Sequence, residues 1–107
     1  MSAGFAVLYR WRIKAGAEDD FIRAWSVATT AFRTIGALGS RLHRTDDGEF
    51  IAYAEWPSRE AWEAARGSSP VDAGTAETMR NATLSFEMLP LEPIADLLAR
   101  SVSDNNR

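Results

Sequence analysis

Aromatic and β-branched side chains occupy every second position from Phe5 to Ile13, and Arg10 and Arg12 lie between them. Alternation of this kind predicts a strand with one buried face. Thr45-Asp46-Asp47-Gly48 predicts a hairpin turn, because an Asp-Gly pair tolerates the positive φ angles of a tight turn. Three further strands are predicted, at residues 38–44, 49–56 and 82–89.

An amphipathic helix is predicted between the first two strands. Three carboxylates at residues 18–20 begin it, where the helix macrodipole favours negative charge. Gly36 fits the left-handed conformation that commonly follows a helix. The apolar positions recur in steps of four and three residues, at Phe21, Trp25, Ala28, Phe32 and Ile35.

A second helical region follows the third strand and is interrupted once. Ser58 can cap a helix over residues 59–66, and Gly67-Ser68-Ser69-Pro70 then breaks the pattern. Serine is a good cap, and proline is favoured at the first helical position. We therefore expect Ser69 to begin a further helix that runs to about Asn81.

The chain after the fourth strand has a different pattern. Prolines predict an irregular exit, and Ile94, Leu97 and Leu98 have the spacing of a short amphipathic helix. We therefore expect one folded domain over residues 1–92. A short C-terminal helix and a loose tail are expected over residues 93–107.

The element order βαββαβ predicts an α+β, ferredoxin-like fold, with an antiparallel four-stranded sheet in the order 4-1-3-2 and the helices on one face. The other face, which bears Leu8, Arg10 and Arg12, has no helix left to cover it. We expect a second copy of the chain to cover it. Because strand one lies between strands three and four, we also expect Arg10 and Arg12 to pair with Glu55 and Glu87.

Composition narrows the chemistry. The chain has 107 residues, no cysteine and one histidine, which excludes disulfides, thiolate metal sites and a multi-histidine site within one chain. Its net charge of −3 gives no general attraction to nucleic acid or to anionic membranes. No segment resembles a signal peptide, and none approaches the roughly 20 apolar residues of a membrane span. We expect a cytoplasmic protein.

No phosphate loop, nucleophile elbow, dinucleotide fingerprint or metal motif is present. The aromatic residues on the predicted helix-facing layer are the main candidates. They either form an ordinary core or surround a pocket for a flat ligand, with the break at residues 67–70 beside its mouth. His43 is either structural or a catalytic base.

Three segments resemble the antibiotic biosynthesis monooxygenase (ABM) domain family: residues 7–16 (VLYRWRIKAG), 38–44 (LGSRLHR) and 52–62 (AYAEWPSREAW). The resemblance implies ferredoxin-like monomers that pair sheet to sheet as a homodimer, the dimeric α+β barrel. The family includes cofactor-independent monooxygenases that oxidise polycyclic phenols to quinones, and haem-degrading members. In the quinone-forming members the substrate lies between sheet and helices, next to Trp, Tyr, Asn and Arg side chains, and itself supplies the electrons that activate dioxygen.

The family's functional positions match this sequence unevenly. The Asn, Trp and His of the haem-degrading members fall on Tyr9, near Ala65 and near Thr75, so the resemblance does not imply haem degradation here. The quinone-forming members carry an Asn near the start of helix two, where this chain has Ser58. Trp62 fits their Trp one turn further on.

These considerations predict a cofactor-independent monooxygenase, without metal, that acts on a small aromatic or polyketide-like substrate. The alternatives are a non-catalytic small-molecule binder of the same fold, and a cyclase or lyase that uses His43 as base. The predicted catalytic residues are Trp62, Tyr9, Ser58 and His43. The predicted substrate-binding residues are Trp25, Trp11, Phe32, Arg80 and Phe86.

Overall fold

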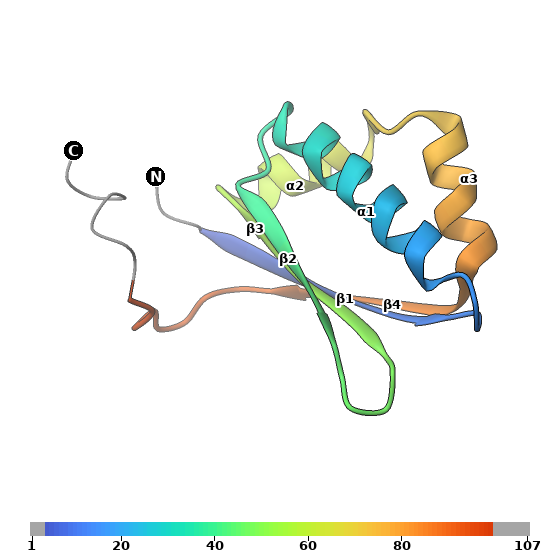
Figure 1. The fold of residues 1–107 in the computed structure, drawn as a ribbon. Coiled ribbons are helices and arrows are strands. Elements are labelled where there is room, and N and C mark those ends of the chain that lie inside the picture. Colours follow the sequence, from blue (N-terminus) through green and yellow to red (C-terminus); the bar gives the residue numbers. More distant parts are fainter. Residues whose placement is uncertain (1–3, 100–107) are drawn as a thin grey trace.

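The structure, a computed structural model, describes residues 4–99 and confirms the predicted ferredoxin-like fold (Figure 1). The second helical region is divided into two helices. The elements in chain order are β1 (Phe5–Ile13), α1 (Glu18–Arg33), β2 (Gly39–Arg44), β3 (Phe50–Trp56), α2 (Arg59–Arg66), α3 (Ala73–Ala82) and β4 (Thr83–Leu91).

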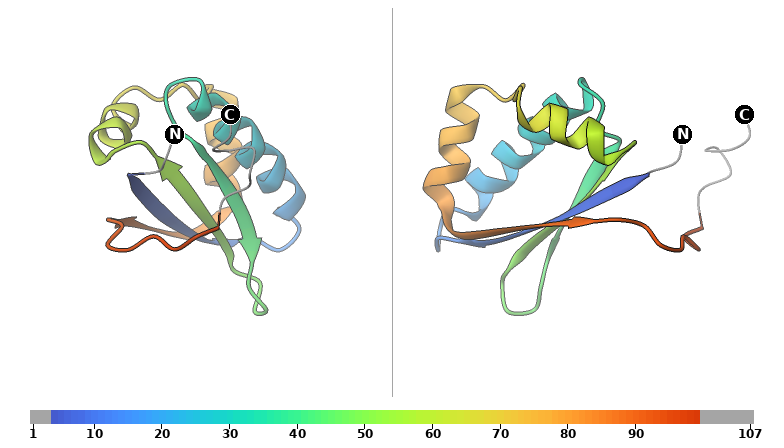
Figure 2. Two further views of the ribbon diagram at one scale, coloured as in Figure 1. Left: turned by 90° about the vertical axis from the view of Figure 1, so that its left-hand side faces the viewer. Right: turned by 180° about the vertical axis from the view of Figure 1, so that it is seen from behind.

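The four strands form one antiparallel sheet in the order β2-β3-β1-β4, which is the predicted order counted from the other edge. All three helices lie on one face of the sheet, and no helix of residues 4–99 lies on the other (Figures 1 and 2). We call these the helix-covered face and the open face. Tyr9 pairs with Ala52 and Met88, whereas Arg10 pairs with Ile51 and Glu87. Side chains at neighbouring positions of β1 therefore point to opposite faces of the sheet.

The core lies between the sheet and the helices. Near one end of β1, Phe5 and Val7 pack with Trp62 of α2. Near the other, Trp11 meets Phe21 of α1 edge to face, with ring centroids 5.0 Å apart. Burial of each such large apolar side chain contributes about 1.5–3 kcal/mol to stability, which fixes the helices on this face.

The start of α3 differs from the prediction. Asp72 is its cap: the carboxylate accepts hydrogen bonds from the Thr75 backbone N–H and from the Thr75 hydroxyl, both at 2.8 Å. Ser69 instead accepts a hydrogen bond from the Val71 N–H at 3.2 Å, within the turn. The expectation that Ser69 and Pro70 begin the helix is therefore wrong.

The end of the chain also differs. The fourth strand extends through Pro90 to Leu91; a proline is tolerated there because β4 is an edge strand. Residues 92–99 contain no helix, and Ile94 and Leu97 are exposed, so the predicted C-terminal helix is wrong for this segment. The predicted loose tail from residue 101 lies outside the described residues.

The arginines of the open face pair differently from the expectation. Arg10 donates to both carboxylate oxygens of Glu49 at 3.0 Å and lies 3.4 Å from Glu87, which confirms one predicted pair. Arg12 lies 3.7 Å from Asp47 and 3.8 Å from Glu49. Within the described chain neither arginine pairs with Glu55, because the β1–β3 register places Glu55 opposite Ala6.

Within residues 4–99, no helix combines the length and the apolar character that a bilayer crossing requires.

Candidate functional site

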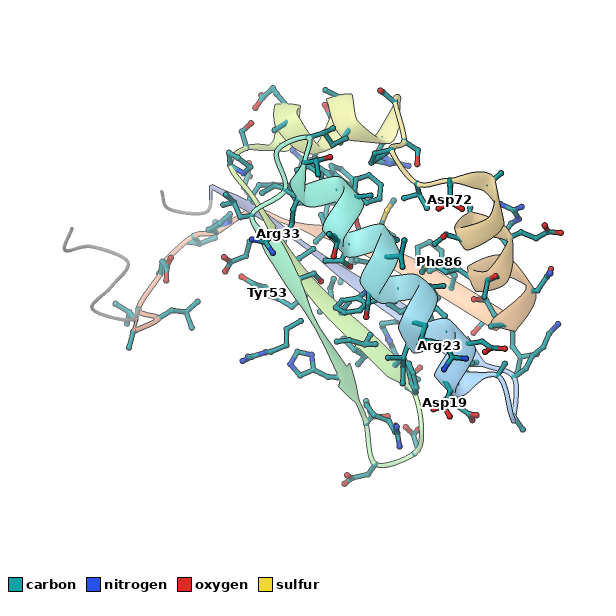
Figure 3. The ribbon with its side chains drawn as sticks, turned by 45° about the horizontal axis from the view of Figure 1, so that its top comes forward. Asp19, Arg23, Arg33, Tyr53, Asp72 and Phe86 are labelled. Atoms are coloured by element: carbon teal, nitrogen blue, oxygen red, sulfur yellow. The ribbon has the colours of Figure 1, made fainter. Side chains whose placement is uncertain are left out.

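A cavity of about 550 Å³ lies between the helix-covered face and the three helices. Its volume is in the range of pockets that hold small organic molecules. Figure 3 shows Phe86 in the space between the ribbons of α1 and α3. The four tryptophans of the chain all line the cavity, so its wall is strongly aromatic. The aromatic lining residues are Tyr9, Trp11, Trp25, Phe32, Trp56, Trp62 and Phe86.

The alternation of β1 and β4 creates the floor of this cavity. Tyr9 and Trp11 point to the helix-covered face, and their rings stack with centroids 5.8 Å apart. Phe86, paired with Trp11 across the strands, places its ring 5.6 Å away. The chain between α2 and α3 forms part of the rim, where Ser69 and Val71 line the cavity. The break in the second helical region is therefore part of the site.

One hydrogen-bonded pair supplies a polar group on the wall. The Trp62 Nε1–H donates to the Tyr9 hydroxyl at 3.3 Å. Burial raises the pKa of Tyr9, so its hydroxyl stays protonated near neutral pH. Since Trp62 donates to the hydroxyl oxygen, the hydroxyl proton can be donated to a ligand. This arrangement suits a carbonyl or phenolate oxygen.

Arg66 adds positive charge to this pair, and the sequence interpretation missed it. Its guanidinium lies over the Trp62 ring, 4.8 Å from the centroid. The positive charge of Arg66 favours the ionised form of Tyr9 and so opposes the effect of burial on that pKa. The signal was present in the sequence, because residues four apart on a helix lie on the same side.

Two residues that line the cavity each have a buried polar atom without a hydrogen-bond partner in the described chain. Trp56 Nε1 and Ser40 Oγ are buried and have no hydrogen-bond partner within residues 4–99. Both residues line the cavity. Trp56 was also missed, although it follows the same alternation in β3 as the buried residues Phe50, Ala52 and Ala54.

The predicted site residues fall into two groups. Those predicted to bind substrate, together with Tyr9 and Trp62, all line the cavity. Ser58 and His43 do not. Ser58 accepts a hydrogen bond from the Ala61 N–H at 3.0 Å as the cap of α2. His43 lies on edge strand β2, where Arg41 donates to its Nε2 at 3.2 Å.

Metal ligands do not cluster in the described part of the chain. Among residues 4–99, no three His, Cys, Asp or Glu side chains come together in a group that could hold a metal ion.

The sequence profile of the antibiotic biosynthesis monooxygenase family matches residues 4–77. No curated protein has a significantly similar sequence. Many solved structures resemble the chain over the whole domain, and three of them are described below. Their sequence identities to this chain are low, so the likeness establishes the fold alone.

The first of these structures is SnoaB from Streptomyces nogalater, described as a cofactor-independent oxygenase. Its TM-score is 0.75 and its sequence identity is 18%, and the match covers 90% of this chain and 98% of SnoaB. The second is a monooxygenase from the gene ActVA-Orf6 of Streptomyces coelicolor in complex with Nanaomycin D, with a TM-score of 0.72 and 18% identity over 92% of this chain and 94% of that one. The third is a dimeric ferredoxin-like protein from an uncultured marine organism, with a TM-score of 0.75 and 6% identity over 92% of this chain and 95% of that one.

Proposed function

The chain belongs to the antibiotic biosynthesis monooxygenase family, and from that membership we propose that it oxidises a planar phenolic substrate with dioxygen, without a bound cofactor. The observation that carries the proposal is the aromatic cavity of about 550 Å³ with the Tyr9–Trp62 pair on its wall. The description of SnoaB as a cofactor-independent oxygenase supports it, and so does the Nanaomycin D bound to the ActVA-Orf6 monooxygenase.

The cavity wall offers a flat substrate both stacking and hydrogen bonding. Rings such as Trp25 and Phe86 present large aromatic surfaces, which favour offset or edge contacts with a polycycle. The Tyr9 hydroxyl donates to one oxygen of the substrate, and the positive charge of Arg66 favours the deprotonated form of that oxygen. An electron-rich phenolate is the form that gives an electron to dioxygen most readily.

The proposed reaction balances without an external reductant. A methylene group between two aromatic rings of a phenolic polycycle reacts with one dioxygen molecule, and the products are a ketone at that carbon and one water molecule. The substrate carbon supplies all the electrons that dioxygen accepts. One oxygen atom enters the product, and the other leaves as water with the two hydrogens of the methylene group. The protein binds and orients the substrate, stabilises its anion and limits the access of water.

We also propose a homodimer formed through the open face, which bears Leu8, Arg10 and Arg12. Leu89, paired with Leu8 across the strands, is 54% exposed, so this face presents apolar surface beside its ion pairs. The dimeric ferredoxin-like relative supports this arrangement. Light scattering should give the molar mass of a dimer, whose interface we expect to bury more than about 1,000 Å² in total. A monomer at tens of micromolar protein contradicts it.

Oxygen consumption with a dihydroxyanthrone tests the catalytic proposal. Chelator-treated protein should consume one dioxygen for each anthrone and produce the anthraquinone faster than the uncatalysed reaction. Tyr9→Phe should lower kcat by about 100- to 1,000-fold, since it removes the hydroxyl that donates to the substrate anion. Tyr53→Phe, at the other tyrosine of the chain and on the open face, is the matched control and should leave kcat unchanged.

The alternatives give different results in the same assay. Binding of the anthrone without oxygen consumption favours a non-catalytic binder. A cyclase or lyase would have to use a base other than His43 within the cavity, because His43 does not line it. Absence of both binding and oxygen consumption overturns the proposed function.

A further inference from the structure

A groove runs along one edge of the sheet, between helix α1 and edge strand β2. Two adjoining hollows of about 300 and 400 Å³ form it, and both are lined by Trp25 of α1 and Ser40 of β2. Its lining comes from one side of α1, from residues 38–44 and from Phe50. We call it the edge groove.

The edge groove is positively charged. Arg33, Arg41 and Arg44 line it and are exposed, and Figure 3 shows Arg33 beside the start of β2. Among the described residues, no Asp or Glu lines this groove. The acidic chain, with a net charge of −3, therefore places three positive charges and no negative charge along it. Within residues 4–99 the ion pairs involve other arginines: Arg10, Arg12 and Arg23.

The backbone of β2 can still pair on its outer side. β2 is an edge strand, so within residues 4–99 its outer side pairs with no strand. The Thr45 N–H donates to the Glu49 carbonyl at 2.8 Å. Hydrogen bonding alternates along an antiparallel pair, so the backbone groups of Ser40, Leu42 and Arg44 point away from β3. These groups can bind one more strand.

The two faces of β2 offer that strand different contacts. Leu42 pairs with Ala52, so its side chain lies on the helix-covered face, where Trp25 of α1 also lines the groove. Arg41 has the opposite parity, and its side chain donates to the His43 Nε2 at 3.2 Å. A strand beside β2 therefore meets apolar side chains on one face and positive charge on the other.

We propose that the edge groove binds an extended acidic peptide of a partner protein, which adds to the sheet beside β2. The outer edge of β2 offers donors and acceptors at the spacing of another peptide backbone, and the arginines favour a peptide with carboxylates. Alternating acidic and apolar residues fit the two faces of β2. The inference is independent of the proposed reaction, because it uses the edge of the sheet and not the aromatic cavity.

Fluorescence anisotropy with a labelled peptide of alternating glutamate and valine tests the proposal. Its Kd should be at least about tenfold lower than that of the same peptide with glutamine in place of glutamate, because charge-assisted contacts are lost. The difference should decrease as salt is raised, since the arginines are exposed. N-methylation of alternate peptide groups keeps the charge, blocks the backbone donors and should abolish binding.

Arg41→Gln should raise the Kd of the glutamate peptide about tenfold, and Arg41→Lys should keep part of the affinity. Arg23→Gln is the matched control, because it changes the net charge equally at an exposed arginine of α1 outside the groove (Figure 3). Its affinity for the peptide should equal that of the unaltered protein. Circular dichroism melting confirms that each variant is folded.

Amide hydrogen exchange locates the peptide on the backbone. Saturating peptide should slow the exchange of the Ser40, Leu42 and Arg44 amides, which point away from β3. The amides of Arg41 and His43 point towards β3 and should exchange at an unchanged rate.

Four results overturn the proposal. The first is no anisotropy change at about 1 mM glutamate peptide, where even weak specific binding is detectable. The second is equal binding of the N-methylated peptide, which means that the backbone edge is not used. The third is equal binding of a labelled oligodeoxythymidine, which means a general anion surface. The fourth is slow exchange of the Ser40 and Leu42 amides before peptide is added, which means that a second copy of the chain covers the edge.

Discussion

The two faces of the sheet are built by the same strands and differ in how their polar groups are satisfied. On the open face, Arg10 and Arg12 of β1 form ion pairs with Glu49, Glu87 and Asp47. On the helix-covered face, aromatic side chains surround a cavity whose polar groups are few and partly unpaired.

The difference shows how a pocket can be distinguished from a core. A stripe of aromatic residues in the sequence is expected of a core and of a pocket alike. Ser40 and Trp56 both line the cavity, and each has a buried polar atom with no hydrogen-bond partner within residues 4–99. Buried polar groups are nearly always hydrogen-bonded, so these two unpaired atoms distinguish the cavity from an ordinary core and support the proposed ligand site.

Trp62→Ala should have the largest effect on the helix-covered face. Trp62 is 3% exposed and packs against Phe5 with ring centroids 5.4 Å apart. Removing the ring should lower the free energy of unfolding by about 3–5 kcal/mol, measured by urea denaturation. A loss below about 1 kcal/mol would contradict the packing described for this side chain.

Trp25→Ala is the matched control for that variant. Trp25 is only half-buried but lines the same cavity. Its removal should cost less stability than Trp62→Ala and still weaken the binding of a planar phenol. Unchanged affinity in Trp25→Ala would show that the ligand does not occupy this part of the cavity.

Tyr9→Phe should have the next largest effect. It leaves the buried Trp62 Nε1–H without its acceptor. The free energy of unfolding, measured by urea denaturation, should therefore fall by about 1–3 kcal/mol. Tyr53→Phe, on the open face, serves as the control.

The pH dependence of stability gives a second readout of Tyr9. Burial raises its pKa in the folded state above the unfolded value of about 10. The neutral hydroxyl therefore stabilises the fold fully below about pH 10, and this contribution is lost as the pH rises through the folded pKa. Above about pH 10 the stability of the unaltered protein should fall more steeply than that of Tyr9→Phe. Parallel curves would mean that Tyr9 is not buried as described.

On the open face, Glu49→Gln should lower the melting temperature by a few degrees. The Glu49 side chain is 13% exposed and accepts two hydrogen bonds from Arg10. Glu87→Gln should change the melting temperature much less, because that side chain is 73% exposed and its ion pair is screened. If Glu87→Gln lowers the melting temperature more than Glu49→Gln does, then the Arg10–Glu49 pair is not the main ion pair on this face.

Ser40→Ala should have the smallest effect on stability. It removes a buried hydroxyl that has no hydrogen-bond partner within residues 4–99, so the melting temperature should stay the same or rise slightly. A clear decrease in thermal scans would show that Ser40 has a partner in solution.

Much of the fold could be predicted because its signals are local. The limits of β1 and α2 follow from alternation and from the Ser58 cap, and they agree with the structure to the residue. The start of α3 was harder, since Ser69 and Asp72 are both plausible caps. Asp72 caps the helix, and its carboxylate binds both the backbone and the hydroxyl of Thr75.

The ion pairs and the site depend on contacts that no local pattern contains. Glu49 is the partner of Arg10 because of the β1–β3 register, which the strand order alone does not fix. Most of the aromatic lining followed from local patterns: the alternation of β1 and β4 for Tyr9, Trp11 and Phe86, and helical spacing for the others. Trp56 was the exception. The place of Arg66 over Trp62 also depended on the rotation of α2 about its axis.

The central claim is that the helix-covered face, and not the open face, binds the ligand. NMR titration of isotopically labelled protein with a dihydroxyanthraquinone tests it directly, because every tryptophan of the chain lines the cavity while Tyr53, paired with Leu8, belongs to the open face. The indole N–H signals of Trp25 and Trp62 should shift, and the ring signals of Tyr53 should stay in place. Shifts confined to Tyr53, or no shifts at saturating ligand, would contradict the account.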